Sequence, residues 1–239
     1  MSTSNVSNLV KANAVKPIYS ITPFTLLDYP DKTACIVWFA GCNMRCLYCY
    51  NPDIVLGKGK LSFQDLILFL KSRVNLLDGV VLSGGECTLQ KNLFQLIQEI
   101  KKLGLVVKID TNGSNPKTLA LLIKEKLLDY VALDFKAPHE KFKYITKVDY
   151  YSQFIATLKL LIASAIPFEV RTTYHSSLLA LTELQQMIAI LEKHDYRGVY
   201  YIQNFRNDTR TLSAVANSEP NTINNAVLKA NFKVALRNF

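Results

Sequence analysis

The chain has 239 residues, of which 49% are hydrophobic and 20% charged, a composition typical of a globular protein and not of a disordered one. Its formal net charge is +9, but Lys and Arg are scattered through the expected helices, which favours a generic basic surface over a nucleic-acid site. The most apolar stretch, residues 154–170, is interrupted by Lys159, Ser164 and Pro167 and is too short to span a membrane. Residues 1–15 lack the apolar core of a signal peptide. We therefore expect a cytoplasmic protein without a membrane partner, in which a metal explains the five cysteines better than disulfides do.

The expected elements begin after a polar segment rich in Ser and Asn, which we predict to be a flexible N-terminal tail over residues 1–17. Residues 33–39 have the β-branched and aromatic composition of a strand buried on both faces, and they lead directly into Gly41 and a loop of three cysteines. A capping pattern from Ser62 to Asp65 predicts the start of a helix. Further strands are expected over 79–82, 105–110, 130–135, 168–173 and 199–203, and further helices over 92–102, 116–126, 151–163 and 181–193, the last with a capping box from Thr182 to Gln185.

Six strands that alternate with helices predict an α/β fold with right-handed crossovers and a parallel sheet, either open or curled into a partial barrel. We expect one such domain over residues 18–212. Residues 213–239 form a C-terminal extension in which apolar side chains recur at helical spacing, so an amphipathic, basic helix is predicted from Thr222 onward. A helix packed on the core is favoured there over one that docks a partner or a membrane surface.

The cysteine loop is the strongest chemical signal in the sequence. Cys42, Cys46 and Cys49 have the spacing C-x3-C-x2-C, which lets consecutive thiolates bind one metal centre. Three ligands on a four-iron cluster leave one iron open to a substrate or cofactor. Cys35 lies inside an apolar strand and is expected to be a core residue, and Cys87 is a less favoured candidate for a fourth ligand.

Polar residues follow the predicted strands at their carboxyl ends, where parallel α/β folds bind ligands. A turn or an ion pair explains each of these signals about as well as a ligand site does, and a single His is more often a satisfied core residue than a ligand. Their convergence on one face, together with the cysteine loop, favours a site. The residues are Ser83 to Glu86, Asp110 to Gly113, Asp134 and Lys136, Arg171 and His175, and Gln203, Phe205 and Arg206.

The cysteine motif, with the aromatic Tyr48 inside it, resembles the cluster motif of radical S-adenosylmethionine (SAM) enzymes. Within that superfamily the chain resembles the glycyl-radical-enzyme activating proteins, and most of all those of anaerobic ribonucleoside-triphosphate reductase. The chain departs from the usual pattern at Asp31, where Gly is common, and at Cys87, where Pro is common. The matching segments run in the expected order: Leu27-Asp28-Tyr29-Pro30, Gly41-Cys42, Tyr50-Asn51-Pro52, Ser83-Gly84-Gly85-Glu86, Asp110-Thr111-Asn112-Gly113, Ala132-Leu133-Asp134-Phe135-Lys136, Arg171 to His175, and Gln203 to Arg206.

This resemblance implies a partial (β/α)6 TIM-type barrel with parallel strands, the radical SAM core, that holds one [4Fe-4S] cluster and SAM. It implies cluster ligation by Cys42, Cys46 and Cys49, with the amino and carboxylate groups of SAM on the fourth iron. The remaining implied contacts to SAM are Tyr48 at the adenine, Gly84, Gly85 and Glu86 at the methionyl ammonium, Asp110, Asp134 and Lys136 at the methionyl carboxylate, directly or through a monovalent cation, and Arg171 and His175 near the ribose or carboxylate.

The resemblance implies that the protein is an oxidoreductase. The cluster would cleave SAM reductively, and the resulting 5′-deoxyadenosyl radical would generate a glycyl radical on a partner enzyme. The expected partner is anaerobic ribonucleoside-triphosphate reductase. The cluster and SAM carry the chemistry, so no catalytic side chain is expected. A flavodoxin- or ferredoxin-type protein is the expected electron donor. One alternative is a radical SAM enzyme that acts on a nucleobase or small heterocycle. Another is an iron-sulfur or zinc module for electron transfer or structure.

Overall fold

The computed structural model describes residues 16–219, 223 and 228–239. The contacts divide the chain into two compact units, which we describe separately. Unit 1 contains the described chain up to Asn43, Asp53–Asp110 and Leu122–Tyr130, and unit 2 contains Met44–Pro52, Thr111–Leu121 and Val131–Phe239. None of the helices described is long and apolar enough to cross a membrane.

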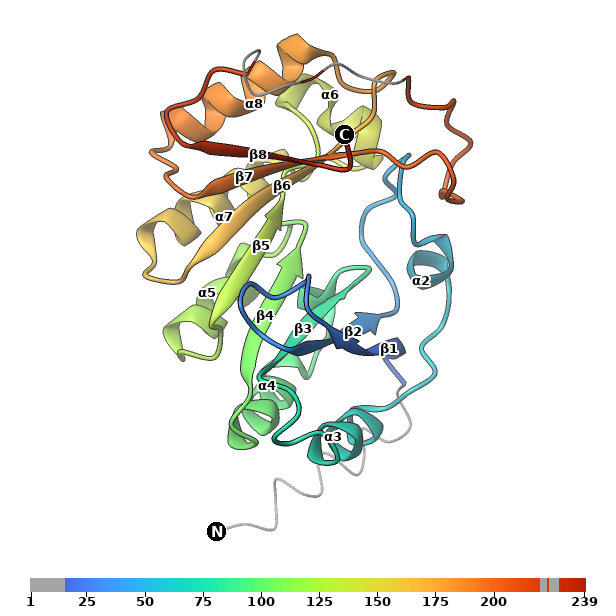
Figure 1. Ribbon diagram of the computed structural model, residues 1–239, viewed down its shortest axis with the longest axis vertical. Coiled ribbons are helices and arrows are strands. Elements are labelled where there is room, and N and C mark those ends of the chain that lie inside the picture. Colours follow the sequence, from blue (N-terminus) through green and yellow to red (C-terminus); the bar gives the residue numbers. More distant parts are fainter. Residues whose placement is uncertain (1–15, 220–222, 224–227) are drawn as a thin grey trace. The chain divides into compact units, whose positions relative to one another are not determined.

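Unit 1 is built on strands that lie side by side in chain order (Figure 1). The first strand runs antiparallel to the second, and the next two pairings are parallel. Phe39 pairs with Gly84, so the carboxyl ends of the second and third strands are level. This register brings the start of the cysteine loop beside the Gly-Gly-Glu turn. The strands are β1 (Ile18–Thr25), β2 (Ala34–Phe39), β3 (Gly79–Gly84) and β4 (Val106–Thr111).

Two helices of unit 1 begin close to where the local sequence predicts, whereas α2 and η2 were not predicted. In α3 (Phe63–Lys71), the Ser62 hydroxyl accepts the N–H of Asp65, whose carboxylate accepts the N–H of Ser62, which completes the expected capping box. Helix α4 (Leu93–Lys102) is followed by Gly104 at φ +81°, a conformation that favours glycine. The remaining helices in this part of the sequence are α2 (Pro52–Leu56), the 3-10 turn η2 (Cys87–Leu89) and α5 (Pro116–Lys124).

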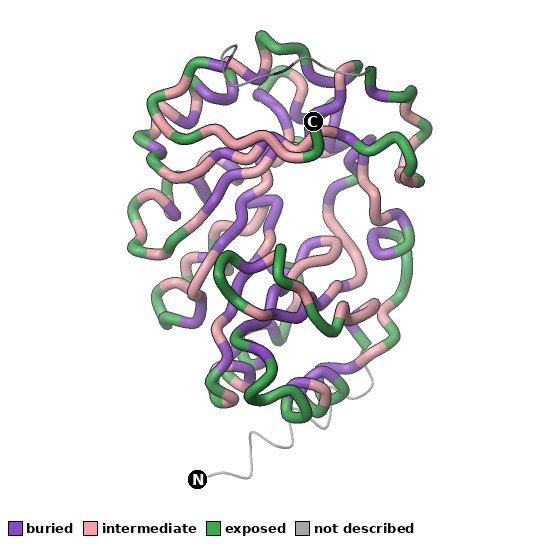
Figure 2. Tube along the Cα trace, in the orientation of Figure 1, coloured by how far each residue is buried: buried purple, intermediate pink, exposed green. Residues whose placement is uncertain are grey.

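Unit 2 continues with parallel strands in chain order. Figure 2 shows its strands as largely buried or half-buried, with the exposed residues concentrated in helices and connections. Phe135 stacks on Phe154 with ring centroids 4.4 Å apart, which fixes helix α7 against β5. The elements are β5 (Tyr130–Asp134), α6 (His139–Thr146), α7 (Tyr151–Ala163), β6 (Phe168–Tyr174), α8 (Leu181–Lys193), β7 (Val199–Asn204) and β8 (Lys233–Arg237).

The C-terminal helix predicted from Thr222 is not formed over residues 233–237, which instead pair with β7 as strand β8. Val234 and Leu236 also alternate with the period of a strand, and pairing with β7 satisfies backbone groups that a helix would leave open at that edge. Arg237 lies over the ring of Tyr201, 3.6 Å from its centroid. The start of the predicted helix, and all of the N-terminal tail except residues 16 and 17, lie outside the described residues.

The capping box predicted from Thr182 is also wrong by two positions. Helix α8 begins at Leu181, and the Glu183 carboxylate accepts the N–H of Ala180 at 2.6 Å. Alanine has no side-chain acceptor, so only the glutamate half of a capping box is present. The same carboxylate pairs with Lys141 of α6, which explains why the helix starts here.

Candidate functional site

The cysteine loop begins in unit 1, where it lies against the Gly-Gly-Glu turn. The N–H of Glu86 donates to the carbonyl of Gly41 at 3.0 Å. A Cβ at Gly85 would lie 1.8 Å from that carbonyl oxygen, and Gly84 has φ +113°. The backbone of the Gly-Gly-Glu turn packs closely against the backbone of Gly41, which precedes Cys42. This close packing requires glycine at positions 84 and 85.

Glu86 is a buried carboxylate with 1% of the residue exposed. Its Oε1 accepts the N–H of Thr88 at 3.1 Å and the Thr88 hydroxyl at 2.6 Å, so it caps the turn η2. Position 87, where related proteins commonly have Pro, is Cys87 here, and the Glu86 carboxylate holds this turn through its hydrogen bonds to Thr88. A buried acceptor held in this way is suited to an ammonium ligand.

Cys87 and Cys35 lie in surroundings that disfavour the thiolate form. The Cys87 Sγ donates to the carbonyl of Asp110 at 3.5 Å, and burial, together with Glu86 and Asp110, raises the pKa of the thiol well above its usual value. Burial likewise raises the pKa of Cys35 to about 12. Since the thiolate is the form that binds metal, both residues are better suited to structural roles.

The rest of the cysteine loop lies in unit 2, between a helix end and a returning segment. The N–H groups of Arg45 and Leu47 donate to the carbonyls of Thr146 and Ile145, at 2.9 and 3.0 Å. These carbonyls belong to the last turn of α6, where helices leave acceptors without internal partners. On the other side, the N–H of Leu212 donates to the carbonyl of Cys49 at 2.9 Å. The loop is therefore fixed by backbone contacts that do not depend on a cofactor.

Tyr48 lies in this loop with a buried hydroxyl that has no hydrogen-bond partner in the described part of the chain. Burial raises the pKa of its hydroxyl, while the nearby ammonium of Lys136 opposes the shift. Cys46 and Cys49 are among the groups that act on it. Because an unpartnered buried hydroxyl is costly, this one is suited to a polar ligand.

Asp134 forms the centre of a charged cluster at the end of β5. Its Oδ2 lies 3.0 Å from Lys136 Nζ, and its Oδ1 lies 3.0 Å from a terminal nitrogen of Arg171. Burial alone would raise the pKa of this carboxyl, but the two cations outweigh burial and hold it below its usual value. Burial would lower the pKa of Lys136, yet Asp134, Tyr48 and Cys46 raise it well above the ordinary value. The aspartate and both cations are therefore charged near neutral pH.

His175 is engaged by protein on both ring nitrogens. Its Nδ1 accepts the N–H of Ser177 at 3.2 Å, so Nε2 carries the proton and donates to the carbonyl of Ala216 at 2.9 Å. The ring is buried against Phe205, with centroids 4.5 Å apart. The ring therefore has protein partners of its own, and its contact with the ribose or carboxylate of SAM stays a prediction.

After β4 the chain makes the turns that the sequence suggests. The N–H of Gly113 donates to Thr111 Oγ1 and the N–H of Ser114 to Asn112 Oδ1, and Thr157 of α7 donates to the carbonyl of Gly113. Thr111 and Asn112 are therefore used first to shape the connection to α5. Asp110, which precedes them, accepts from Lys108 and Ser83.

Sequence reasoning named Tyr50, Phe205 and Arg206 but missed that they support the cysteine loop. Tyr50 stacks on Phe205 with centroids 5.2 Å apart, and its hydroxyl accepts the N–H of Arg206 at 2.7 Å. Phe205 and Arg206 of the matching segment therefore support the loop. The sequence contained one signal for this contact: an aromatic residue, Tyr50, follows the last cysteine, and another, Phe205, follows the last predicted strand.

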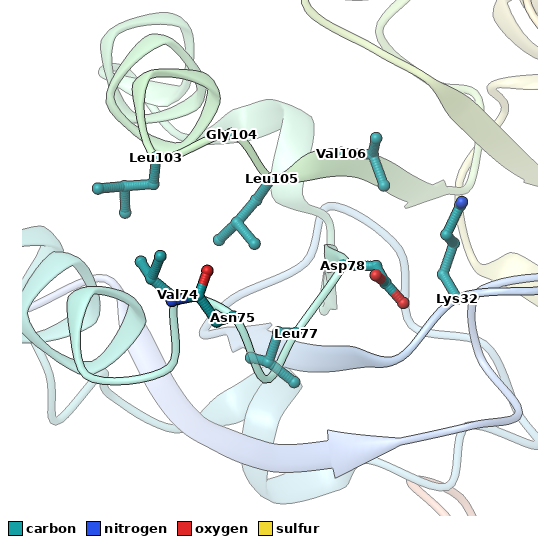
Figure 3. Close-up of a pocket in the computed structure, with 9 residues that line it drawn as sticks. All are labelled: Lys32, Val74, Asn75, Leu77, Asp78, Leu103, Gly104, Leu105 and Val106. Atoms are coloured by element: carbon teal, nitrogen blue, oxygen red, sulfur yellow. The ribbon is translucent and has the colours of Figure 1, made fainter.

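A hollow of about 490 Å³ in unit 1 lies away from the predicted residues (Figure 3). It opens at the amino ends of β3 and β4, and the predicted chemistry lies at their carboxyl ends. Figure 3 shows the side chains of Val74, Leu103 and Leu105 facing one another across it, with Lys32 and Asp78 together at one side. It contains none of the predicted site residues.

Comparisons with known proteins identify the family. The model of the radical SAM superfamily matches residues 36–180. A protein of Methanocaldococcus jannaschii that bears the name of a glycyl-radical enzyme activating enzyme is 31% identical over 198 residues, which are 79% of each chain. The chain belongs to the glycyl-radical-enzyme activating enzymes of the radical SAM superfamily. It is therefore an enzyme of the radical SAM activase class, as the sequence predicted.

Other similar proteins match only part of their own length. A protein of Saccharolobus islandicus named as a GTP 3′,8-cyclase is 30% identical over 161 residues, which are 64% of this chain and 52% of that one. The structure of Streptococcus suis SuiB bound to S-adenosylmethionine matches with a TM-score of 0.63 and 15% identity over 98% of this chain and 53% of that chain. The chain thus spans about half the length of these two proteins. The predicted fold class, α/β with a radical SAM core, is confirmed.

The cofactors of this superfamily are a [4Fe-4S] cluster and SAM, and the residues present are compatible with them. Cys42, Cys46 and Cys49 form no disulfide within the described residues, and the buried Tyr48 hydroxyl has no hydrogen-bond partner among them. The side chains of the described residues do not by themselves gather three metal ligands at one point. The assignment of the three cysteines therefore rests on their spacing and on the family.

Proposed function

We propose that this enzyme generates a glycyl radical on a partner enzyme, and that the partner is an anaerobic ribonucleoside-triphosphate reductase. The match along 79% of a glycyl-radical enzyme activating enzyme supports the reaction class. The likeness of the segments Asp28 to Pro30 and Gln203 to Arg206 to activating proteins of that reductase supports the partner. The contacts of Phe205 and Arg206 with Tyr50 add to this, because they tie the second segment to the cysteine loop.

Each unit contains preformed contacts that we propose for the cofactors. From unit 1 come Cys42 as a cluster ligand, Gly84, Gly85 and Glu86 for the methionyl ammonium, and Asp110 for the methionyl carboxylate. From unit 2 come Cys46 and Cys49 as cluster ligands, Tyr48 for the adenine, and the group of Asp134, Lys136 and Arg171 for the carboxylate or ribose. The core domain is proposed to cover residues 18–212, with 213–239 as an extension.

Cys42, Cys46 and Cys49 would hold a cluster that passes one electron to SAM, and this reductive cleavage would supply methionine and the 5′-deoxyadenosyl radical for removal of a hydrogen atom from the target glycine. The electron comes from a flavodoxin- or ferredoxin-type donor. The chain's own residues position SAM and exclude water, since Cys46 and Tyr48 are buried and Glu86 is 1% exposed. No side chain has to move a proton in this reaction, which agrees with the absence of a catalytic residue among those predicted.

The test is to mix the anaerobically reconstituted, reduced protein with SAM and an anaerobic ribonucleoside-triphosphate reductase, and to record the radical by electron paramagnetic resonance. We expect a glycyl-radical doublet and about four irons per protein. The variant Cys46→Ala should lose both, while Cys87→Ser, which changes a cysteine outside the loop, should keep both. A full cluster in Cys46→Ala would refute the ligand assignment. Cleavage of SAM without a glycyl radical would refute the partner.

A second candidate is a radical SAM enzyme that acts on a nucleotide, which the likeness to the GTP 3′,8-cyclase of Saccharolobus islandicus favours. The two proposals differ in what stimulates cleavage of SAM. Stimulation by GTP in the absence of a protein partner would support the nucleotide reaction. Stimulation by the reductase, with no effect of GTP, would support the activase.

A further inference from the structure

Lys108 is a buried cation that the proposed function leaves without a role. Its side chain is 1% exposed, and it lies within β4 two residues before Asp110. A lysine is almost never fully buried unless it is paired. Its Nζ lies 2.6 Å from Asp110 Oδ1, so unit 1 contains a buried ion pair at the carboxyl end of a strand.

The position of Lys108 along β4 shows which groups lie on either side of it on the same face of the strand. Alternate residues of a strand face the same side, so Lys108 shares a face with Val106 and Asp110. Val106 packs against the apolar cluster that contains Ile36 and Val81. Lys108 therefore lies where the apolar interior of unit 1 ends and the polar series at the strand ends begins.

Asp110 is held on both of its oxygens. Lys108 binds Oδ1, and the Ser83 hydroxyl donates to Oδ2 at 3.2 Å. The Asp110 side chain is 12% exposed and that of Lys108 only 1%. The carboxylate is thus the part of the pair that a ligand reaches, and the ammonium behind it fixes its orientation and balances its charge.

A carboxylate at this place creates a problem for the proposed cofactor. The methionyl end of SAM also carries a carboxylate, and two like charges at close range in a buried site repel each other strongly. Binding requires a cation that serves both. Lys108 supplies one within the fold, with three N–H donors, of which Asp110 takes one.

We propose that Lys108 is a built-in counter-cation of the SAM site: it neutralises and orients Asp110, so that the carboxylate end of SAM binds without a monovalent metal ion. Lys108 is in this sense a positioning residue, because it acts through Asp110. The inference rests on the proposed placement of Asp110 at the cofactor.

The experiment measures SAM binding to the reconstituted protein by anaerobic titration in a buffer whose cation is choline, and again with added K⁺. We expect the wild-type affinity to be the same in both within about twofold. In choline, Lys108→Met should bind SAM roughly tenfold to a hundredfold more weakly, the range expected for a lost charge-assisted contact. Added K⁺ or methylammonium should restore much of that affinity, because either can take the place of the lost ammonium.

The double variant Lys108→Met/Asp110→Asn is the matched control, since it removes both charges and leaves no carboxylate to attract a cation. Because the repulsion is then gone, it should bind SAM more tightly than Lys108→Met does in choline, and added K⁺ should not change its affinity. Thermal unfolding of the cluster-free proteins gives a second readout, in which K⁺ should raise the melting temperature of the single variant alone. A role of Lys108 in packing alone would produce no such response to K⁺.

Two results would overturn the inference: wild-type binding that depends on K⁺, or a Lys108→Met variant that binds SAM in choline as tightly as wild type. The first needs no variant, so the proposal stays open to refutation even if Lys108→Met does not fold. Neither measurement includes the partner enzyme. A missing glycyl radical would therefore contradict the proposed function and leave the result on Lys108 intact.

Discussion

Gly85→Ala tests whether the contact between the Gly-Gly-Glu turn and the cysteine loop is required for the cluster. The new Cβ would lie 1.8 Å from the carbonyl oxygen of Gly41 and 3.1 Å from the Cβ of Cys42. The two backbones would have to separate by more than an ångström. The hydrogen bond from Glu86 to Gly41, now 3.0 Å long, would then exceed the range of a real bond.

The magnitude follows from two contributions. Forcing an extra group into a packed contact costs about 1–3 kcal/mol, and loss of a hydrogen bond adds about 0.5–1.5 kcal/mol. We expect the free energy of unfolding of the cluster-free protein to fall by about 2–4 kcal/mol. The iron content after anaerobic reconstitution should fall as well, because Cys42 follows the displaced Gly41 in the chain.

Gly104→Ala is the matched control. Gly104 has φ +81° and no atom within 4 Å of the new Cβ, so this variant is strained in its backbone alone, at about 1–2 kcal/mol. Both variants are compared by urea unfolding and by iron analysis. A Gly85→Ala variant that unfolds like Gly104→Ala and keeps a full complement of iron would refute the role of the contact.

Three further predictions concern single side chains. Asp134→Asn should remove a pH-dependent part of the stability. The pKa of Asp134 is lowered in the folded protein, so its ionised form stabilises the fold fully above about pH 4, and this contribution is lost as the pH falls through the folded pKa. Acid unfolding curves that coincide for variant and wild type would contradict this. Tyr48→Phe should raise the unfolding free energy of the cluster-free protein by about 1 kcal/mol, since it removes a buried hydroxyl without a partner, and should weaken SAM binding; destabilisation in urea would show that the hydroxyl is satisfied. Asp31→Gly should stabilise by about 0.5–1 kcal/mol, because Asp31 has φ +57°; an unchanged urea midpoint would show that the loop bears no strain.

Local signals predicted most of the fold. Strand β2 and the capping box at Ser62 could be predicted because buried strands and helix caps depend on residues that are close together in the sequence. Helix α6 was missed, since its eight residues are short and follow Pro138. Its formation is favoured by contacts remote in sequence, namely the N–H groups of Arg45 and Leu47 on its last carbonyls.

Remote pairing also explains why the C-terminal helix prediction was wrong and why the partner of His175 could not be predicted. Residues 233–237 form β8 because they pair with the edge of β7. The helical spacing of apolar residues gives no information about such pairing. His175 is satisfied by Ala216, which is 41 positions away. The cysteine loop, by contrast, could be recognised from spacing alone, since its chemistry depends on residues three and four positions apart.

The charges at the strand ends are more ordered than a count of polar residues suggests. Each predicted carboxylate already has a partner within its own unit: Glu86 has Thr88, Asp110 has Lys108, and Asp134 has Lys136 and Arg171. Such pairs hold their dipoles and charges in place before a ligand arrives, so the ligand does not have to reorganise them. The ammonium and carboxylate of SAM then differ in what they meet, because Glu86 is held by neutral donors whereas Asp110 and Asp134 are held by cations. Under the proposed function, an ammonium is expected to gain most at Glu86 in unit 1, and a carboxylate beside Lys136 and Arg171 in unit 2.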